Sequence, residues 1–132
     1  MAGSLQHSCP CGSGTSYDAC CGRLHRVAAQ AVTAEELMRS RYAAYAVGHH
    51  DHLFRTWHPR TRPADPAMQA EGGLTWRGLE ILDTVGGGQD DETGEVEFLA
   101  RYRAGAVDGV LHERSRFVRR AGRWVYLDGD AG

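Results

Sequence analysis

The sequence predicts an α+β domain in which a curved antiparallel sheet wraps around N-terminal helices, with a small cysteine-rich segment in front of it. Three observations lead to this prediction. Apolar residues recur at three- and four-residue steps over residues 33–48, they alternate with polar ones in four segments after residue 73, and four cysteines crowd into residues 9–21. Helices followed by strands that short turns connect favour a helical layer packed on one antiparallel sheet.

The chain has the size of one ordinary domain with a small appendage, and its charge is nearly balanced. It contains 132 residues with a formal net charge of −2 and an isoelectric point near 6.4. A slightly acidic chain lacks the positive field that attracts phosphate backbones, so nucleic-acid binding is disfavoured. The sequence contains no basic and apolar leader and no run of about 18 apolar residues, which predicts a cytoplasmic protein that does not insert into a membrane.

The four cysteines lie in a segment with hardly any apolar residues. Residues 7–25 cannot build a hydrophobic core of their own, so they need a metal ion or a host surface to become ordered. In a reducing cytoplasm such a cluster favours metal ligands over disulfides, and a bridge between the adjacent Cys20 and Cys21 would be strained. We therefore expect a metal-binding motif with its connector over residues 1–30 and a larger α+β domain over residues 31–132.

The spacing of the cysteines suits one structural Zn²⁺. The first two are separated by one residue and project to the same side of an extended segment, and the glycines after them allow a tight reversal. A helical turn would then deliver the adjacent second pair. Because four thiolates leave no coordination position for water, the site is predicted to be structural and not hydrolytic. The predicted ligands are Cys9, Cys11, Cys20 and Cys21, with His25 or His7 as the alternative for the fourth position.

The best-supported helix begins after residue 33. Thr33 and Glu36 form a capping box, and Gly48 stands where a glycine would end the helix. The apolar stripe between them predicts one face toward a core, with Arg39 and Arg41 facing outward. The other expected elements are a short helix over residues 51–57, a loop over residues 59–73 and strands over residues 74–85, 96–103, 110–119 and 123–127.

The phase of the strands decides which side chains face the helices. On residues 96–103 the alternate set that begins at Val96 is the more apolar one, so Glu97 and Arg101 are expected to face outward. On residues 110–119 both sets carry charges, and the pattern leaves the inward set undecided. A strand with charges on both faces predicts a polar cavity on one side of the sheet.

A cone-shaped cavity would bring together side chains that can bind a ligand or take part in acid–base chemistry. The predicted pocket residues are Tyr42, Trp76 and His112, and the catalytic candidates are His58, Glu113 and Arg116. Imidazole titrates near neutrality and burial can raise a carboxyl pKa toward it, so such a set can serve general acid–base chemistry. The favoured alternative is structural, with Glu113 and Arg116 in ion pairs and His58 at a helix end.

The run His49-His50-Asp51-His52 resembles a second metal site. Histidines three residues apart can share a helix face, but this spacing fits no standard ligand pattern. The favoured interpretation is an exposed helix entrance.

Two resemblances extend these predictions. Residues 9–21, CPCGSGTSYDACC, closely resemble the SEC-C motif, a zinc-binding module attached to assorted bacterial proteins, although the lysines usual in that motif are absent. The segments ELMRSRYAAY, TWHP, WRGLEILDT, VEFLARYR and HERSRFVRRAGRWVYLDGD are similar to the bacterial YchJ family. The two resemblances together cover nearly the whole chain. They imply a zinc motif followed by a nuclear transport factor 2-like, or cystatin-like, cone whose function is uncharacterised.

Two functional hypotheses follow. The leading one is a non-catalytic interaction or adaptor protein, in which the zinc motif contacts a protein partner and the cone binds a small ligand or a second copy of the chain. The alternative is a small-molecule enzyme of the isomerase or dehydratase kind that uses the polar pocket.

Overall fold

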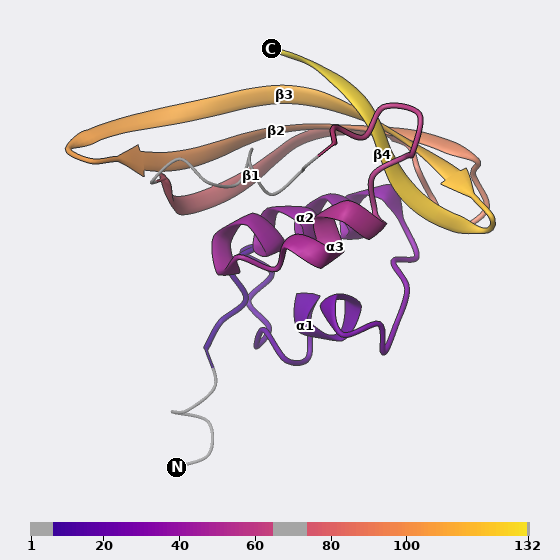
Figure 1. Ribbon diagram of the computed structural model, residues 1–132, viewed down its shortest axis with the longest axis horizontal. Coiled ribbons are helices and arrows are strands. Elements are labelled where there is room, and N and C mark those ends of the chain that lie inside the picture. Colours follow the sequence, from indigo (N-terminus) through magenta and orange to yellow (C-terminus); the bar gives the residue numbers. More distant parts are fainter. Residues whose placement is uncertain (1–6, 65–73, 132) are drawn as a thin grey trace.

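The structure, a computed structural model, describes residues 7–64 and 74–131, which form three layers. Figure 1 shows a curved sheet above, helices α2 and α3 beneath it, and the cysteine-rich segment with α1 as the lowest layer. The helices are α1 (Cys21–His25), α2 (Ala34–Val47) and α3 (His50–Arg55), and the strands are β1 (Leu74–Gly86), β2 (Thr93–Ala104), β3 (Val107–Arg120) and β4 (Arg123–Ala131). The predicted α+β class with a curved antiparallel sheet is confirmed.

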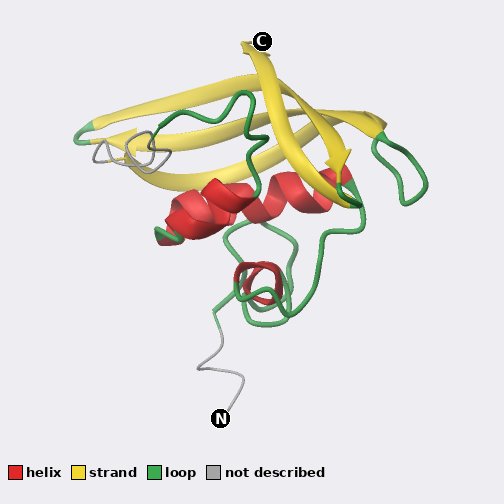
Figure 2. Ribbon diagram, turned by 45° about the vertical axis from the view of Figure 1, so that its right-hand side comes forward, coloured by secondary structure: helices red, strands yellow, loops and turns green. Residues whose placement is uncertain are grey.

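The sheet is a meander in the order β1-β2-β3-β4, and each pair of neighbours is antiparallel. Register shifts interrupt the pairing of β1 twice and that of β3 once, between Arg116 and Phe117. Such bulges bend a strand and increase its twist, so the sheet curves. Figure 2 shows helix α2 lying under the concave face that results.

Helix α2 has well-defined caps. The Thr33 hydroxyl accepts a hydrogen bond from the Glu36 amide at 3.1 Å, and the Glu36 carboxylate accepts one from the Val32 amide at 2.7 Å. The predicted capping box is thus present, with its second bond made to the residue before the cap. Gly48 ends the helix with φ of 78°, a left-handed conformation that favours glycine.

The first turn of α2 lies tightly against the β1–β2 turn. The Ala34 amide donates to the Gly87 carbonyl at 2.9 Å, and a Cβ atom at Gly94 would overlap the Cα of Gly87. Glycine is therefore required at this contact. The indole of Trp124 donates to the Val32 carbonyl at 3.1 Å and joins β4 to the same end of the helix.

The main core lies between α2 and the concave face of the sheet. On β2 the side chains of Val96 and Phe98 are buried, whereas Glu97 lies on the outer face and Arg101 is exposed, so the predicted phase of this strand is confirmed. The buried members of this core are Ala34, Leu37, Met38, Tyr42, Val96, Phe98, Ala100, Phe117 and Trp124.

Strand β3 shows the phase that the sequence left open. Ser115 and Phe117 are each only 1% exposed, so the set that also contains Glu113 faces the helices. His112 and Arg116 belong to the opposite set and lie on the outer face of the sheet, where acidic side chains of neighbouring strands pair with them.

The helix prediction is wrong for Arg41. This side chain was expected to face outward, but it is 4% exposed, and its guanidinium lies 4.9 Å from the ring centroid of Trp57 and 4.8 Å from that of Tyr126. It also donates to the Leu53 carbonyl at 3.1 Å and to the Thr56 hydroxyl at 2.7 Å. Aromatic faces and hydrogen bonds from partners distant in sequence make the burial of a cation tolerable.

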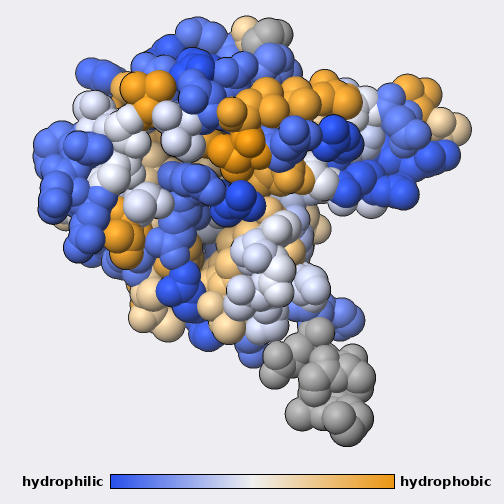
Figure 3. All heavy atoms as spheres, turned by 180° about the vertical axis from the view of Figure 1, so that it is seen from behind, coloured by the Kyte–Doolittle hydropathy of each residue, from blue (hydrophilic) through white to orange (hydrophobic). Residues whose placement is uncertain are grey.

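Several bounds differ from the predictions. The short helix ends at Arg55, and all four strands extend further than their alternating patterns indicated. Of the loop expected over residues 59–73, residues 65–73 lie outside the described ranges. None of the described helices combines the length and apolarity that a membrane crossing requires. Seen from behind, the surface is mostly hydrophilic, and its hydrophobic side chains gather in a few patches (Figure 3).

Candidate metal centre and ligand cavity

The four cysteines converge on one point between a short hairpin and the start of α1. A bridge between Ser8 and Ser16 closes the hairpin, and Gly12 and Gly14 turn it with φ of 82° and 85°. All four cysteine side chains are free thiols, and their sulfur atoms lie within 4.8 Å of one another. Among the described residues these cysteines are the one group of histidine, cysteine and acidic side chains placed to hold a metal ion.

Two distances between the sulfur atoms are close to those of tetrahedral coordination. Cys11 and Cys20 have their sulfurs 3.7 Å apart, and Cys20 and Cys21 have theirs 4.0 Å apart. Zn–S bonds of about 2.3 Å give a tetrahedron whose edge is about 3.8 Å. The Ser13 hydroxyl lies 3.1 Å from the Cys20 sulfur and can support that ligand.

The ionisation of the thiols also favours a cation at this point. A hydrogen bond with Cys21 lowers the pKa of Cys11 to about 4. The same contact, together with burial, raises the pKa of Cys21, and burial raises the pKa of Cys9. The thiolate of Cys11 therefore forms readily, whereas those of Cys9 and Cys21 need a bound cation to balance their charge.

His25 anchors the cysteine segment to α2 and is no ligand. Its Nε2 lies 2.8 Å from the Ser40 carbonyl, which can only accept, so Nε2 carries the proton and Nδ1 accepts from the Tyr17 hydroxyl at 2.6 Å. Both ring nitrogens are engaged, and burial lowers the pKa of this imidazole. The alternative that placed His25 in the fourth ligand position is therefore wrong. His7, the other alternative, is exposed and outside the cluster.

The cysteine segment packs on the face of α2 opposite the sheet. Cys9, Cys11 and Cys21 are buried against Ala43 of that helix. Arg39, which the sequence predicted to be solvent-facing, donates to the Cys11 carbonyl at 2.7 Å. One helix thus lies between the cysteine cluster and the main core (Figure 1).

A cavity of about 360 Å³ lies between the other face of α2 and the sheet. Half of the residues that line it are aromatic, and their rings meet edge to face, as for Tyr42 and Trp76 at a centroid distance of 5.9 Å. Its aromatic lining consists of Tyr42, Tyr45, Trp57, Trp76, Phe98, Tyr102 and Tyr126.

Two groups of opposite charge share this cavity. Glu113 accepts hydrogen bonds from the Ser115 hydroxyl at 2.6 Å and the Tyr126 hydroxyl at 3.0 Å. Arg41 lines the same wall, and burial lowers its pKa. No ion pair joins Arg41 to Glu113, both of which lie in the described ranges. Burial and the negative charge of Glu113 raise the pKa of Tyr126, which keeps this hydroxyl protonated as a donor.

Comparisons with known proteins agree with this architecture. Residues 33–129 match the family described as "YchJ, middle NTF2-like domain". A UPF0225 protein of Streptomyces coelicolor is 55% identical over 122 residues, which cover 92% of this chain and 94% of that protein. This chain belongs to the YchJ family. A second YchJ-like relative, a UPF0225 protein of Corynebacterium efficiens, is 50% identical over 122 residues and 92% of each chain.

Two solved structures share the YchJ-type architecture. The solution structure of a SEC-C motif-containing protein from Rhodopseudomonas palustris has a TM-score of 0.83 at 37% identity and covers 94% of this chain and 98% of its own. The crystal structure of a SEC-C motif-containing protein from Psychrobacter arcticus has a TM-score of 0.77 at 26% identity, with coverage of 100% and 86%. The family and the fold predicted by resemblance are confirmed, and the SEC-C similarity suggests zinc as the metal of the cysteine cluster.

The structure separates the residues predicted to act together. Tyr42, Trp76 and Glu113 line the cavity, as expected. His112 does not, because its strand turns it to the outer face, where it lies 2.6 Å from Glu97. The prediction of His112 as a pocket residue is wrong.

The proposed catalytic set is also dispersed. Arg116 pairs on the outer face with Asp128 at 2.5 Å and Asp130 at 2.8 Å, which fits the structural alternative. His58 lies after α3, where its amide donates to the Tyr126 carbonyl at 2.8 Å and its Nδ1 accepts from the Arg60 amide at 3.0 Å. A mechanism that needs His58, Glu113 and Arg116 in one pocket is therefore wrong.

Sequence reasoning missed the most distinctive cavity residue, Arg41. Its position beside the apolar residues of α2 was only a weak indication of burial, because an arginine on a helix surface normally projects to solvent. Trp57 and Tyr126, which surround it, lie 16 and 85 residues further along the chain.

Proposed function

We propose that this protein binds a small ring-bearing molecule in the cavity between α2 and the sheet, and that a structural Zn²⁺ braces the helix that forms one wall of this cavity. The observation that carries the proposal is the buried Arg41 guanidinium, 4% exposed, in the same aromatic cavity as the Glu113 carboxylate. Two opposite charges that line one cavity without pairing with each other favour a ligand that interacts with both.

The lining defines the class of ligand. A cavity of about 360 Å³ is at the small end of the range for small-molecule sites, and its aromatic walls favour a flat apolar body. Glu113 selects a hydroxyl or amino donor on this body, and Arg41 selects an acceptor. These interactions explain recognition of a ligand without any group that makes or breaks a bond. We therefore propose binding and not catalysis.

The zinc ion has a bracing role in this proposal. Four thiolates close its coordination shell, and three of the four cysteines are buried toward α2. Because the buried cysteines already contact α2 of the same chain, we assign the zinc motif a stabilising role, in place of the contact with a protein partner that the sequence led us to expect. Metal analysis with Co²⁺ substitution is expected to give one ion per chain with four thiolate ligands, and Cys20→Ser is expected to remove one of them, whereas Ser16→Ala is not.

Ligand binding is tested by native mass spectrometry of the protein purified from its bacterial host, followed by an NMR screen of ring-bearing fragments. A retained small molecule, or saturable shifts of the Trp76 and Tyr42 resonances, is expected for the wild type. Glu113→Gln keeps the size of the side chain but removes its charge and is expected to weaken binding about tenfold.

The matched control is Glu97→Gln, on the outer face of the neighbouring strand, which is expected to bind as the wild type does. Equal binding by both variants, or the absence of any retained molecule together with an empty fragment screen, would refute the ligand proposal and leave the zinc assignment intact.

A further inference from the structure

The aromatic cavity contains a cation that no described acidic side chain neutralises. Arg41 is 4% exposed and takes part in none of the ion pairs among the described residues. Buried charges in proteins are normally paired, because an isolated charge is costly to remove from water. The rings of Trp57 and Tyr126 reduce that cost but leave the charge without a counter-ion. An anion bound in the cavity completes the pair.

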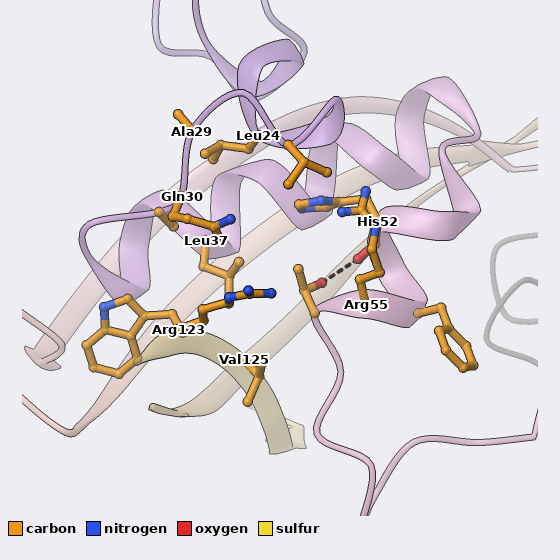
Figure 4. A pocket seen from close by; sticks show the side chains of 13 residues that line it. Leu24, Ala29, Gln30, Leu37, His52, Arg55, Arg123 and Val125 are labelled. Carbon is orange, nitrogen blue, oxygen red and sulfur yellow. Dashed lines mark hydrogen bonds between the residues drawn. The ribbon is translucent and has the colours of Figure 1, made fainter. Parts of the chain in front are cut away.

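One nitrogen of the Arg41 guanidinium is already occupied. Nη1 donates to the Leu53 carbonyl and to the Thr56 hydroxyl. This hydroxyl must accept, because it gives its own proton to the His52 carbonyl at 2.7 Å, the dashed line in Figure 4, which views a neighbouring cavity. Neither Leu53 nor Thr56 lines the aromatic cavity, so Nη1 points toward α3 and not into the cavity.

The other donors of Arg41 are available. Nε and Nη2 form no hydrogen bond of good geometry with a described residue. Two polar side-chain atoms of the described residues are fully buried without a partner, and neither belongs to Arg41. Nε and Nη2 therefore keep some accessible surface, and the space that Arg41 lines is the aromatic cavity. These nitrogens lie on one edge of the planar guanidinium, an arrangement that binds both oxygens of a carboxylate.

The carboxylate of Glu113 is also used on one side only. Both of its hydrogen bonds, from the Ser115 and Tyr126 hydroxyls, are accepted by Oε2. Oε1 accepts none from the described residues, and Glu113 is half-buried in the wall of the cavity. A cationic donor suits this oxygen best, because charge-assisted hydrogen bonds are about twice as strong as neutral ones.

Tyr126 brings the two charges to the same end of the cavity. Its hydroxyl lies 3.0 Å from Glu113 Oε2, and its ring centroid lies 4.8 Å from the guanidinium carbon of Arg41. Burial lowers the pKa of Arg41, and the negative charge of Glu113 opposes this shift. A ligand that meets both charges therefore needs an anionic and a cationic group a short distance apart, as in an α-amino acid.

The opposite end of the cavity is apolar. Along β3 the inward side chains change from Glu113 to Leu111 in the direction of the β2–β3 turn. At the same end Tyr102 of β2 pairs with Trp76 of β1, and their rings meet at a centroid distance of 5.7 Å. A further aromatic ring packs favourably against such a pair. The volume of about 360 Å³, at the small end of the range for ligand sites, suits a single amino acid.

We propose that the ligand of this cavity is an aromatic amino acid, with its carboxylate on Nε and Nη2 of Arg41, its ammonium group on Oε1 of Glu113 and its ring toward Trp76 and Tyr102. This inference rests on the ligand site proposed above, and it adds the charges of the ligand and its orientation.

The test compares three compounds of nearly equal size by calorimetric titration of the full-length, zinc-loaded protein. They are L-phenylalanine, L-phenylalaninamide, in which a neutral amide replaces the carboxylate, and 3-phenylpropionate, which lacks the ammonium group. The titrations are made at about pH 6.5, so that the amine of the amide is mostly protonated. L-Phenylalanine is expected to bind about tenfold more tightly than either of the other two.

Two variants remove the matching charges of the protein. Arg41→Gln is expected to abolish the preference for L-phenylalanine over its amide and to keep the preference over 3-phenylpropionate. Glu113→Gln is expected to have the reverse effect. General damage to the fold does not produce this crossed pattern. The control Arg101→Gln, on the exposed outer face of β2, is expected to leave all three affinities unchanged.

The outcomes separate this inference from the ligand site itself. Equal affinities of the wild type for the three compounds, or equal effects of the two variants on both preferences, overturn the amino-acid assignment. It is also overturned if L-phenylalanine does not bind while other ring-bearing fragments do, and the ligand site then stands. If no fragment binds, both proposals fall. If Arg41→Gln does not fold, the three affinities of the wild type and the effect of Glu113→Gln decide.

Discussion

The cysteine segment and the cone are ordered by different forces. In residues 7–25 the buried side chains include three cysteines, which pack against Ala43 of α2. The cone, in contrast, encloses a continuous apolar core between α2 and the sheet. A segment with so little apolar surface is expected to depend on coordination bonds to the proposed metal ion, whereas the cone depends on hydrophobic burial. Helix α2 therefore has two roles, because it is the core helix of the cone and the surface on which the cysteine segment packs.

Removal of the metal should have the largest effect and should be confined to one region. With a chelator, or in Cys11→Ser, the cysteine segment is expected to lose its protection from amide hydrogen exchange, since zinc coordination contributes about 10 kcal/mol or more to the folding of such motifs. The strands are expected to keep their protection. Unchanged exchange over residues 7–25 after complete metal removal would contradict the division into two regions.

A substitution that leaves a cavity in the apolar core should lower the stability of the cone. Phe117 is 1% exposed and packs against Tyr126 at a centroid distance of 5.7 Å. Phe117→Ala is expected to lower the free energy of unfolding by about 3–5 kcal/mol in urea denaturation of the zinc-loaded protein. The control Val107→Ala removes an exposed side chain and should change it by less than about 0.5 kcal/mol.

Acidification should weaken the junction between the two regions. Burial lowers the pKa of His52 to about 2 and also lowers that of His25, whereas both titrate near 6.5 when unfolded. Below that pH the unfolded chain takes up protons that the folded chain refuses, so these groups stabilise the fold above pH 6.5 and the benefit is lost as the pH falls.

Between pH 7.5 and 5.5 the loss attributable to His52 is expected to be about 1 kcal/mol. His52→Gln should make unfolding less steeply pH-dependent by that amount, while effects of acid on zinc binding remain common to both proteins. Identical pH slopes for the variant and the wild type would contradict a neutral, buried His52.

The smallest predicted effect concerns the contact between the regions. Arg39 donates to the Cys11 carbonyl at 2.7 Å and pairs with Glu35 at 3.0 Å. Arg39→Gln is expected to reduce the local stability of the cysteine segment by about 1 kcal/mol, measured by hydrogen exchange. Arg101→Gln, which removes an exposed pair with Glu80, is the control that should leave the segment unchanged.

Local patterns in the sequence were sufficient to predict most of the helices and strands and the clustering of the four cysteines. Thr33, Glu36 and Gly48 act on backbone groups within one turn, so they predicted both ends of α2. The four cysteines lie within thirteen positions, and the short connection between the two pairs limits where their sulfur atoms can go. Alternation identified the inward set of β2 because one set is clearly apolar.

Tertiary structure decided the positions whose partners lie far away in sequence. Arg41 is buried because Trp57 and Tyr126 provide aromatic faces, and neither is near it in the chain. Glu113 faces the cavity and His112 the outer face because of the register in which β3 pairs with β2, whereas both alternate sets of β3 carry charge. Caps and ligand spacing are short-range properties that a single sequence encodes locally, whereas the burial of a charge depends on the whole environment that folding assembles around it.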